Sequence, residues 1–489
     1  MAVDTPAKEF TEMFQRWKLP MTLIGGTSAM RDAGTEYLPQ EENESDKAYN
    51  IRLNRTFLFN IYKRTIDSLV GSAFNRNVEV NGVPEELAYL EWNVDGEGSS
   101  LTEFAAKLFD DCLVFGKAHT YVDFPEFDPE GKTYADYLEA GLKPYFARIA
   151  PTSLVGWKHE FNNGYEHLNR VRIKETKLEE NDETYEQKYV TYVRVVSEDN
   201  VEVYRNEGGS ALFIGNPSPN TKSLGNYDLV SSYTNALGVV PITTAYGYKV
   251  STMVSKPPLE DLAWMNLCHY QSSSDQRNIL HIARVPFLLG TGFEDGEVEN
   301  VTIAANRMVL STNDNANIKY VEHTGQAISA GRQDLKDIED QCSRLGAEIL
   351  FSKSVSRQTA EARRIDQAEA LSTVQTIIRS IEQSLERAYK LAAMWLDIPS
   401  DFDVSINIGV DLEMPIEPNP VEAIAKLQEL LGLSDEKLLE EAKRRKLVAP
   451  HLTVDDINIV RQAILKQPQN EPETQQDDDS EETSEEESS

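Results

Sequence analysis

The chain has 489 residues, and 48 Lys and Arg against 81 Asp and Glu give it a formal net charge of −33 at pH 7. Ten of the carboxylates lie in residues 469–489, which contain no Lys or Arg, so the remainder still carries about −23. This acidity argues against a protein that grips nucleic acid by neutralising phosphates, because such binding needs a basic face. It is compatible with a wall past which DNA slides, although solubility alone is the simpler explanation. The length is enough for two or three domains, and hydrophobic residues at 40% predict that most of the chain folds.

Cysteine usage and hydropathy indicate the compartment. Cys112, Cys268 and Cys342 are scattered and form no CxxC pair, which favours reduced thiols over a disulfide framework or a structural zinc. The sequence has no apolar run long enough to span a bilayer. We therefore expect a soluble protein that is made in the cytoplasm.

The first half of the chain mixes helical and strand patterns. Apolar spacing predicts helices, and alternation predicts strands. The expected helices are residues 47–74 and 101–114, and the expected strands are 118–124, 170–176, 189–196, 201–205 and a buried approach at 237–242. The Gly-, Ser- and Asn-rich residues 208–233 predict a long surface loop. This half is therefore of the α+β class.

The second half is mostly helical. A helix is expected at 259–280, and its very polar middle, residues 269–278, argues against an apolar core on all sides. Strands 307–311 and 318–322 predict a short hairpin, followed by a helix from near Arg332. Residues 360–395 predict a helix about 54 Å long, which either crosses a large domain or bridges subunits.

Beyond Pro399 the elements are short. The expected elements are a strand at 403–411 and helices at 421–431, 434–446 and 453–466. The acidic residues beyond 467 are too poor in apolar side chains to order themselves.

Motifs of catalysis and cofactor binding are absent from the sequence. It contains no GxxxxGK[ST], HExxH or GxSxG pattern, so we predict no catalytic residues, no cofactor and no metal site. His159, His167 and His323 are conceivable metal ligands, but solvated or hydrogen-bonded histidines explain them more simply.

A set of residues and segments occurs along these elements in a particular order. They are the early Tyr49, Arg52, Leu53, Phe59, Thr65, Gly71 and Phe74, then segments 237–241, 258–262, 286–290, 320–322 with Gly325, and 354–362, and Asn266, His269, Tyr270, Ser274 and Asp275 of the polar helix. In this order the chain resembles the portal proteins of tailed bacteriophages, in a subgroup often described only as a domain of unknown function, and the resemblance runs from Tyr49 to Trp395.

The resemblance implies a portal fold with wing, stem, clip, tunnel and crown regions. Residues 1–256 would form an α+β wing, and 257–350 two stem helices with a small β clip at about 286–330. Residues 351–398 would form the tunnel loop and long tunnel helix, 399–468 a wing return strand and helical crown, and 469–489 a disordered acidic tail. A polar stem helix would fit one that lines a wet channel.

The resemblance also implies a role without chemistry. The chain would be one subunit of a ring, dodecameric in the capsid, at the portal vertex of the virion. Double-stranded DNA would pass non-specifically through its channel during packaging and ejection. The partners would be further copies of the chain, the terminase large subunit, the head–tail adaptor, and capsid and scaffold proteins, with no membrane involved.

Lys353 and Arg357 are the candidate site residues. They are two cations on the implied tunnel loop of an acidic protein, and we expect them to touch DNA phosphates transiently. Pairing with Glu348 or Glu361 on neighbouring turns explains them equally well. Two other functions stay open for the whole chain: another virion assembly protein, such as a scaffold or capsid component, or an intracellular enzyme whose site assembles only in three dimensions.

Overall fold

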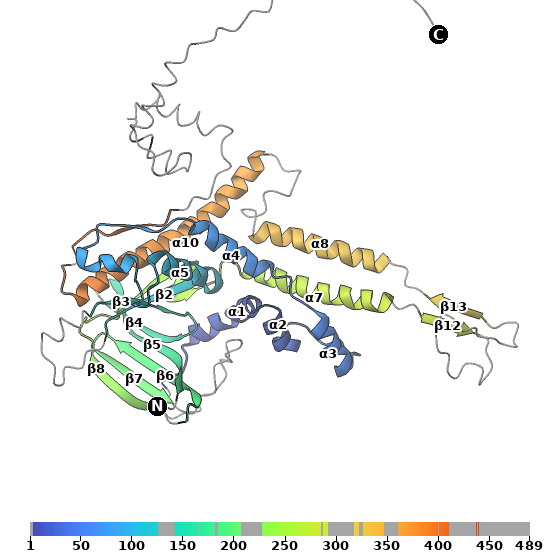
Figure 1. The fold of residues 1–489 in the computed structure, drawn as a ribbon, viewed down its shortest axis with the longest axis horizontal. Helices are drawn as coiled ribbons and strands as arrows, with labels where there is room; N and C mark the ends of the chain where they lie inside the picture. The colour runs from blue at the N-terminus through green and yellow to red at the C-terminus, as the bar shows by residue number, and fades with distance from the viewer. Residues whose placement is uncertain are drawn as a thin grey trace, which may run out of the picture. The chain divides into compact units, whose positions relative to one another are not determined.

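The computed structural model describes residues 3–125, 142–162, 164–180, 184–206, 227–284, 287–291, 317–321, 326–346, 360–399, 401–409, 437 and 439. The chain divides into two units, Met1–Leu412 and Glu413–Ser489. Almost all described residues belong to the first unit, which mixes helices and sheets as expected (Figure 1). The predicted helices at 421–431, 434–446 and 453–466 and the tail lie outside the residues that can be discussed structurally, apart from helical Lys437 and Leu439.

The N-terminal region is a group of helices. They are α1 (Lys8–Ile24), α2 (Gly26–Ala33), the short 3-10 helix η1 (Gly34–Glu36), α3 (Asp46–Arg55) and α4 (Ile61–Ala73). The single helix predicted at 47–74 is wrong, because residues 56–60 between α3 and α4 are not helical. Asn60 begins α4 as its N-cap, its side chain accepting a hydrogen bond from the Lys63 amide.

A three-stranded antiparallel sheet forms the centre of the body. Its order is β3 (Tyr145–Ile149), β2 (Lys117–Asp123), β9 (Ile242–Tyr246). Helix α5 (Leu101–Phe115) precedes β2, begins with a Ser100–Glu103 capping box and ends at Gly116, whose φ of 79° suits glycine. The predicted helix 101–114 and strand 118–124 are confirmed to within a residue. The approach predicted at 237–242 is a turn as far as Pro241, because strand β9 begins only at Ile242.

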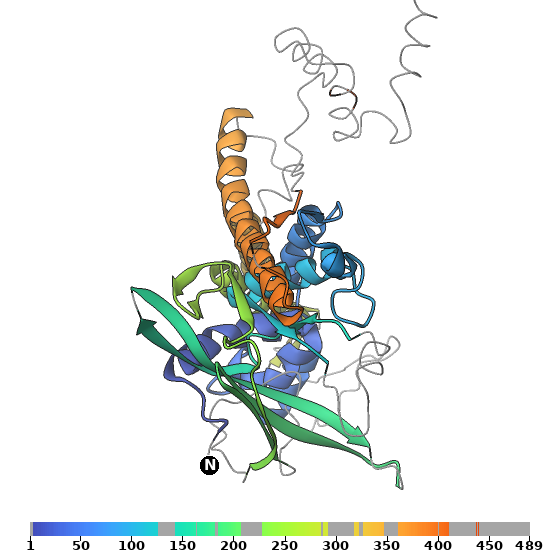
Figure 2. The same ribbon diagram turned by 90° about the vertical axis from the view of Figure 1, so that its left-hand side faces the viewer.

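A second sheet has five antiparallel strands in sequence order. They are β4 (Leu154–Asn162), β5 (Tyr165–Glu180), β6 (Gln187–Ser197), β7 (Asn200–Asn206) and β8 (Asp228–Thr234), and Figure 2 shows their twist. The three predicted alternating runs are the central strands of this sheet. The predicted loop at 208–233 is wrong at its end, where β8 pairs with β7. Residues 207–226 lie outside the described residues.

The second half supplies long helices. They are α7 (Glu260–Ala283), α8 (Gln326–Gly346) and α10 (Ala360–Trp395), which confirms the three predicted helices, although α8 begins six residues before Arg332. Strand β13 (Asn317–Val321) pairs with β12 (Phe287–Thr291). The strand predicted at 307–311 lies outside the described residues. The strand that pairs with β13 is instead β12, about 20 residues earlier in the chain than predicted.

Short elements complete this unit. They are β1 (Glu79–Asn81), the 3-10 helix η2 (Glu85–Glu91), β10 (Lys249–Ser251), β11 (Val254–Ser255) and β14 (Ser405–Asn407). Strand β14 pairs with β1, so the segment after α10 returns to the N-terminal region. The strand predicted at 403–411 is confirmed only at its centre.

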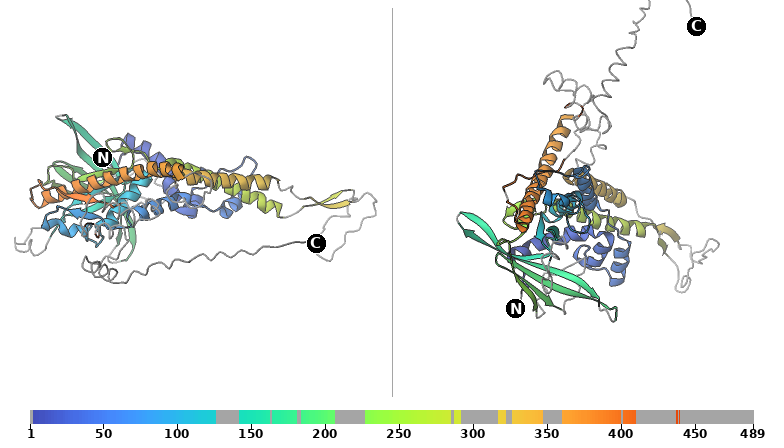
Figure 3. Two further views of the ribbon diagram at one scale, coloured as in Figure 1. Left: turned by 90° about the horizontal axis from the view of Figure 1, so that it is seen from above. Right: turned by 60° about the vertical axis from the view of Figure 1, so that its left-hand side comes forward.

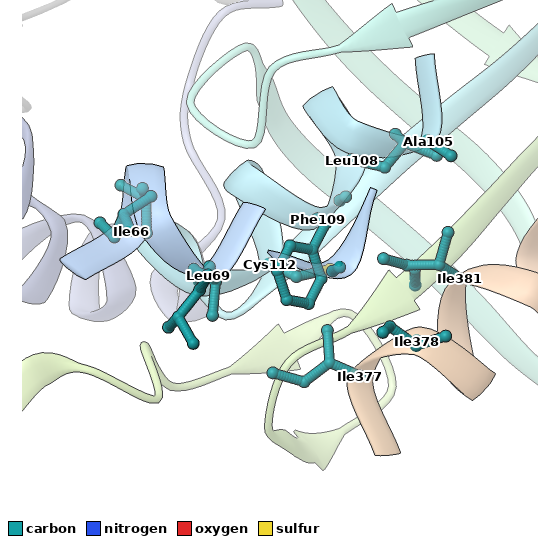
Figure 4. Close-up of a cluster of buried hydrophobic side chains, with 14 of the residues drawn as sticks. Ile66, Leu69, Ala105, Leu108, Phe109, Cys112, Ile377, Ile378 and Ile381 are labelled. Atoms are coloured by element: carbon teal, nitrogen blue, oxygen red, sulfur yellow. The ribbon is translucent and has the colours of Figure 1, made fainter. Parts of the chain in front are cut away.

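The main core lies where α4, α5 and α10 meet (Figure 4). Its apolar side chains come from all three helices and include Ile66, Leu69, Ala105, Leu108, Phe109, Cys112, Ile377, Ile378 and Ile381. Helix α10 also packs on β9 and β2, where the Ser384 hydroxyl donates to Thr243 at 2.9 Å and Ser380 Oγ accepts the Tyr246 amide at 2.8 Å. The long helix therefore crosses the body and is fixed to its central sheet.

Candidate functional site

Helices α7 and α8, with the hairpin β12–β13, form an arm (Figure 3). The two helices run side by side in opposite directions, since His269 meets Glu339 at 3.2 Å while Gln276 donates to the Ile328 carbonyl at 2.9 Å. Helix α8 packs mainly against α7, with a smaller contact to α4. We treat this arm as the candidate interaction site, because most side chains of α8 and one side of α7 are left exposed by the described residues.

Several polar side chains of α7 face inward. Asn266 is fully buried, its Oδ1 accepts the Tyr62 amide and its Nδ2 donates to the Phe59 carbonyl, both at 2.9 Å. Ser274 is also buried, and its Oγ accepts a bond of 2.8 Å from the Thr56 hydroxyl. The explanation of this polarity by a wet channel is therefore wrong for these side chains, because they hold residues 56–60 against the helix.

Arg52 ties the N-terminal helices to the same stretch of α7. Its guanidinium donates to both carboxylate oxygens of Glu44, at 2.9 and 2.7 Å, and to the Pro39 carbonyl at 2.7 Å. Only 5% of the Arg52 side chain is exposed, and NH1 lies 3.4 Å from Ser274 Oγ. The hydrogen bonds from Arg52 lower the pKa of Glu44, so the pair stays charged at neutral pH.

A glycine sets the closest approach between the two helices of the arm. A Cβ atom built on Gly331 would lie 2.1 Å from Oε1 of Gln276. Gln276 is itself buried and donates to the Ile328 carbonyl on the preceding turn of α8. The missing side chain of Gly331 thus makes room for a polar contact that fixes the register of the arm.

A second polar cluster lies inside the body. Lys117 is fully buried, donates to the Met253 carbonyl at 3.0 Å, and lies 4.8 Å from the Trp157 ring and 5.5 Å from the Trp17 ring. Burial lowers the pKa of Lys117 to about 7. Two strand positions further on, burial also lowers the pKa of His119.

A lysine and a histidine of this kind suggest acid–base chemistry, but their surroundings do not. Both side chains are fully enclosed, so no substrate has access to them. His119 forms a hydrogen bond with Thr244, with 2.9 Å between Nδ1 and Oγ1. We conclude that the cluster is structural and holds the β10–β11 segment, which leads into α7, against β2.

The other candidate residues form no site within the described part of the chain. Lys353, Arg357 and His323 lie outside the described residues. His159 and His167 lie on β4 and β5, and within the described part of the chain no group of three or more His, Cys, Asp or Glu is placed to hold a metal ion. Among the described helices, none is both long and apolar enough to cross a membrane.

The contacts of Asn266, Arg52 and Gly331 were not predicted from the sequence, although Arg52 and Asn266 are among the residues that carry the resemblance. The signals present were a very polar helix middle and a glycine within an otherwise regular helix. Neither signal indicates which residues these side chains contact, since the backbone groups that Asn266 binds lie about 200 positions earlier in the chain.

Comparison with known proteins gives one family and a set of solved structures. Residues 258–396 match the family described as a domain of unknown function, DUF4055, a segment that starts just before α7 and ends just after α10. No curated protein matches the chain.

The solved structures that are similar to the chain include the neck of an empty GTA particle computed with C6 symmetry, with 9% identity and a TM-score of 0.40. They also include the virion of a native gene transfer agent (GTA) particle, with 10% identity and a TM-score of 0.39. Each alignment covers 77% of this chain and 88% of the other.

Proposed function

We propose that the chain is the portal vertex subunit of a tailed-phage head. Copies of it would form a ring, dodecameric in the capsid, through which double-stranded DNA is packaged and ejected. The ring would carry no catalytic chemistry of its own. The terminase motor and then the head–tail adaptor would dock on it, and capsid or scaffold proteins would surround it.

The observation that carries this proposal is the arm and its place in the chain. An α+β body is followed by an antiparallel helical pair with a β hairpin at its far end, and then by a helix of 36 residues that returns to the central sheet of the body. This is the order of wing, stem, clip and tunnel helix that the resemblance implies. The DUF4055 match covers the arm and this long helix.

The ring is tested by native mass spectrometry and negative-stain microscopy of the purified chain. We expect a closed assembly with a central channel and a mass that is a multiple of 55.1 kDa. A chain that stays monomeric at every concentration would contradict the proposal. A filament or an open aggregate would favour a scaffold or capsid role instead.

The DNA-facing role of Lys353 and Arg357 is part of this proposal. Replacing both with Glu should reduce packaging and retention of DNA while rings still assemble, because the two cations would no longer offset phosphate charge in the channel. The conservative double change Lys353→Arg and Arg357→Lys is the matched control. Unchanged packaging in the Glu variant would show that the two side chains serve another purpose, such as pairing with Glu348 or Glu361.

A further inference from the structure

The two flanks of the arm carry opposite charge. Helix α8 turns its buried stripe, with Ile338 and Cys342, toward α7. At about 100° per residue, Arg332 and Lys336 lie on one side of that stripe, and Asp334 and Asp337 lie on the other. All four side chains are exposed. Within the described part of the chain, no salt bridge is formed by any of them.

Contacts with α7 extend the basic flank. Glu339 follows Lys336 by three residues on the same side of α8 and meets His269. His269 lies beside the Phe59 ring at 5.6 Å, and Arg277 lies 3.8 Å from the centre of the Phe57 ring. The basic flank thus consists of Arg277, Arg332 and Lys336, with Glu339 and the two half-exposed rings Phe57 and Phe59.

The acidic flank continues on the opposite side of α7. Trp264, Cys268 and Asp275 follow one another at spacings of four and seven and form an exposed stripe. By the same helical geometry, this stripe lies away from residues 56–60. Trp264 and Leu345, which are 56% and 53% exposed, stand at one level, as the register of His269 with Glu339 shows. The acidic flank thus consists of Asp334 and Asp337, with the two apolar side chains and one exposed cation, Arg344, seven residues after Asp337. Asp275 is not counted in it, because its carboxylate lies 3.9 Å from the Arg52 guanidinium.

The charged groups of the two flanks stand at the same height. Arg332, Asp334, Lys336 and Asp337 fall within two turns of α8, about 9 Å along its axis. Each flank also carries two large apolar side chains, which a partner surface would shield from water. A surface with one charge sign on one side and the opposite sign at the same height on the other side fits a head-to-tail contact with an identical surface.

We propose that the acidic flank of the arm binds the basic flank of the arm of a second copy of this chain. The inference rests on the proposed ring, where a rotation about the ring axis brings identical arms together at equal height. Asp334 and Asp337 of one copy would face Arg332 and Lys336 of the next. Trp264 and Leu345 of one copy would approach the rings of Phe57 and Phe59 of the next.

Charge reversal tests this pairing. The acidic-flank variant is Asp334→Lys with Asp337→Lys, and the basic-flank variant is Arg332→Glu with Lys336→Glu. Each alone should raise the protein concentration needed for assembly by about tenfold or more, because like charges then meet at every contact. Mixing the two variants in equal amounts should restore assembly as rings of alternating variants, since one is now basic on both flanks and the other acidic on both.

The control is Glu85→Lys with Glu86→Lys, which makes the same charge change as the acidic-flank variant at two exposed positions of η2. It should assemble like the wild type, as read by native mass spectrometry. Single variants that assemble like the wild type would overturn the pairing while leaving the ring intact. If the wild type itself stayed monomeric, the ring proposal would fail. In that case association in the mixture would still uphold the pairing of the flanks, and its absence would overturn it.

Discussion

Lys117 lies between two tryptophan rings with its ammonium on the Met253 carbonyl. Its pKa in the fold, about 7, is below the value of about 10.4 expected in the unfolded chain. Between these values the unfolded chain binds more protons, so this group makes stability rise with pH from about 7 to about 10. Below pH 7 both states are protonated, and the full cost of burying the cation is present.

Replacing Lys117 with Met should therefore stabilise the protein most at acidic pH. We expect the free energy of unfolding to rise by roughly 2 to 4 kcal/mol at pH 6, after the loss of one hydrogen bond, and the gain to shrink toward pH 10. Urea denaturation of both proteins at pH 6, 8 and 9.5 measures the difference. A difference that did not change with pH would show that Lys117 titrates normally in the fold.

Gly331 and Gln276 should behave as a coupled pair. Gly331→Ala alone should destabilise the arm by about 1 to 2 kcal/mol, because the new Cβ displaces the Gln276 amide from the Ile328 carbonyl. In a Gln276→Ala background the same change should stabilise by up to about 1 kcal/mol through helix propensity. Hydrogen exchange of α8 amides gives the two values, and equal effects in both backgrounds would rule out the contact.

At the scale of whole elements, α7 is stabilised by buried polar bonds as well as by apolar packing. Asn266 holds a donor and an acceptor of the backbone around the start of α4. Asn266→Leu would leave the Tyr62 amide without this partner and remove one of the two bonds to the Phe59 carbonyl, which also accepts from the Ile61 amide at 3.0 Å. We therefore expect a loss of about 1 to 3 kcal/mol in the free energy of unfolding. Cys268→Leu, at an exposed position two residues away, should change it by less than about 0.5 kcal/mol. Thermal or urea unfolding of the two variants makes the comparison.

Periodicity predicted the elements well where packing follows the local pattern. The bounds of α10 and the central strands of the five-stranded sheet are examples. It failed at residues 56–60, where the apolar spacing continues through Phe57. The reason is non-local, because Arg31 donates to the Thr56 carbonyl, while the Asn266 side chain donates to the Phe59 carbonyl and accepts from the Tyr62 amide. Helix α1 was not predicted, since charged residues and an internal Pro20 interrupt its pattern.

The candidate site was predicted only in outline. The resemblance implied two stem helices with a small β clip, but the polarity of α7 was assigned to a water-filled channel instead of to contacts with residues 56–60. Helical spacing alone would have separated Arg332 and Lys336 from Asp334 and Asp337, whereas the side that faces α7 is known only from the buried stripe with Ile338. The partners of Lys117 come from α1, β4 and the β10–β11 turn, which no local pattern connects.

At the scale of the whole molecule, the charge of −33 opposes the association of identical copies. Residues 469–489 contribute ten of the negative charges. Truncation after Pro468 should therefore promote assembly at low salt by roughly tenfold in concentration, and the advantage should vanish near 1 M salt, where the Debye length falls to about 3 Å. Analytical ultracentrifugation of both chains across a salt series measures it. A benefit that persisted at high salt would point to a specific contact of the tail.

The elements that precede and follow the arm in the chain both belong to, or pack on, the three-stranded central sheet. The chain enters α7 from the β10–β11 segment, directly after β9, and its return helix α10 packs on β9 and β2. The reach of the arm is therefore set by the lengths of α7 and α8 alone. A matched insertion of seven residues in each helix, beyond Gln276 and before Ile328, would carry the β12–β13 tip about 10 Å further while nearly keeping the same faces in contact. We therefore expect that the length of the arm can change without a change in the core that supports it.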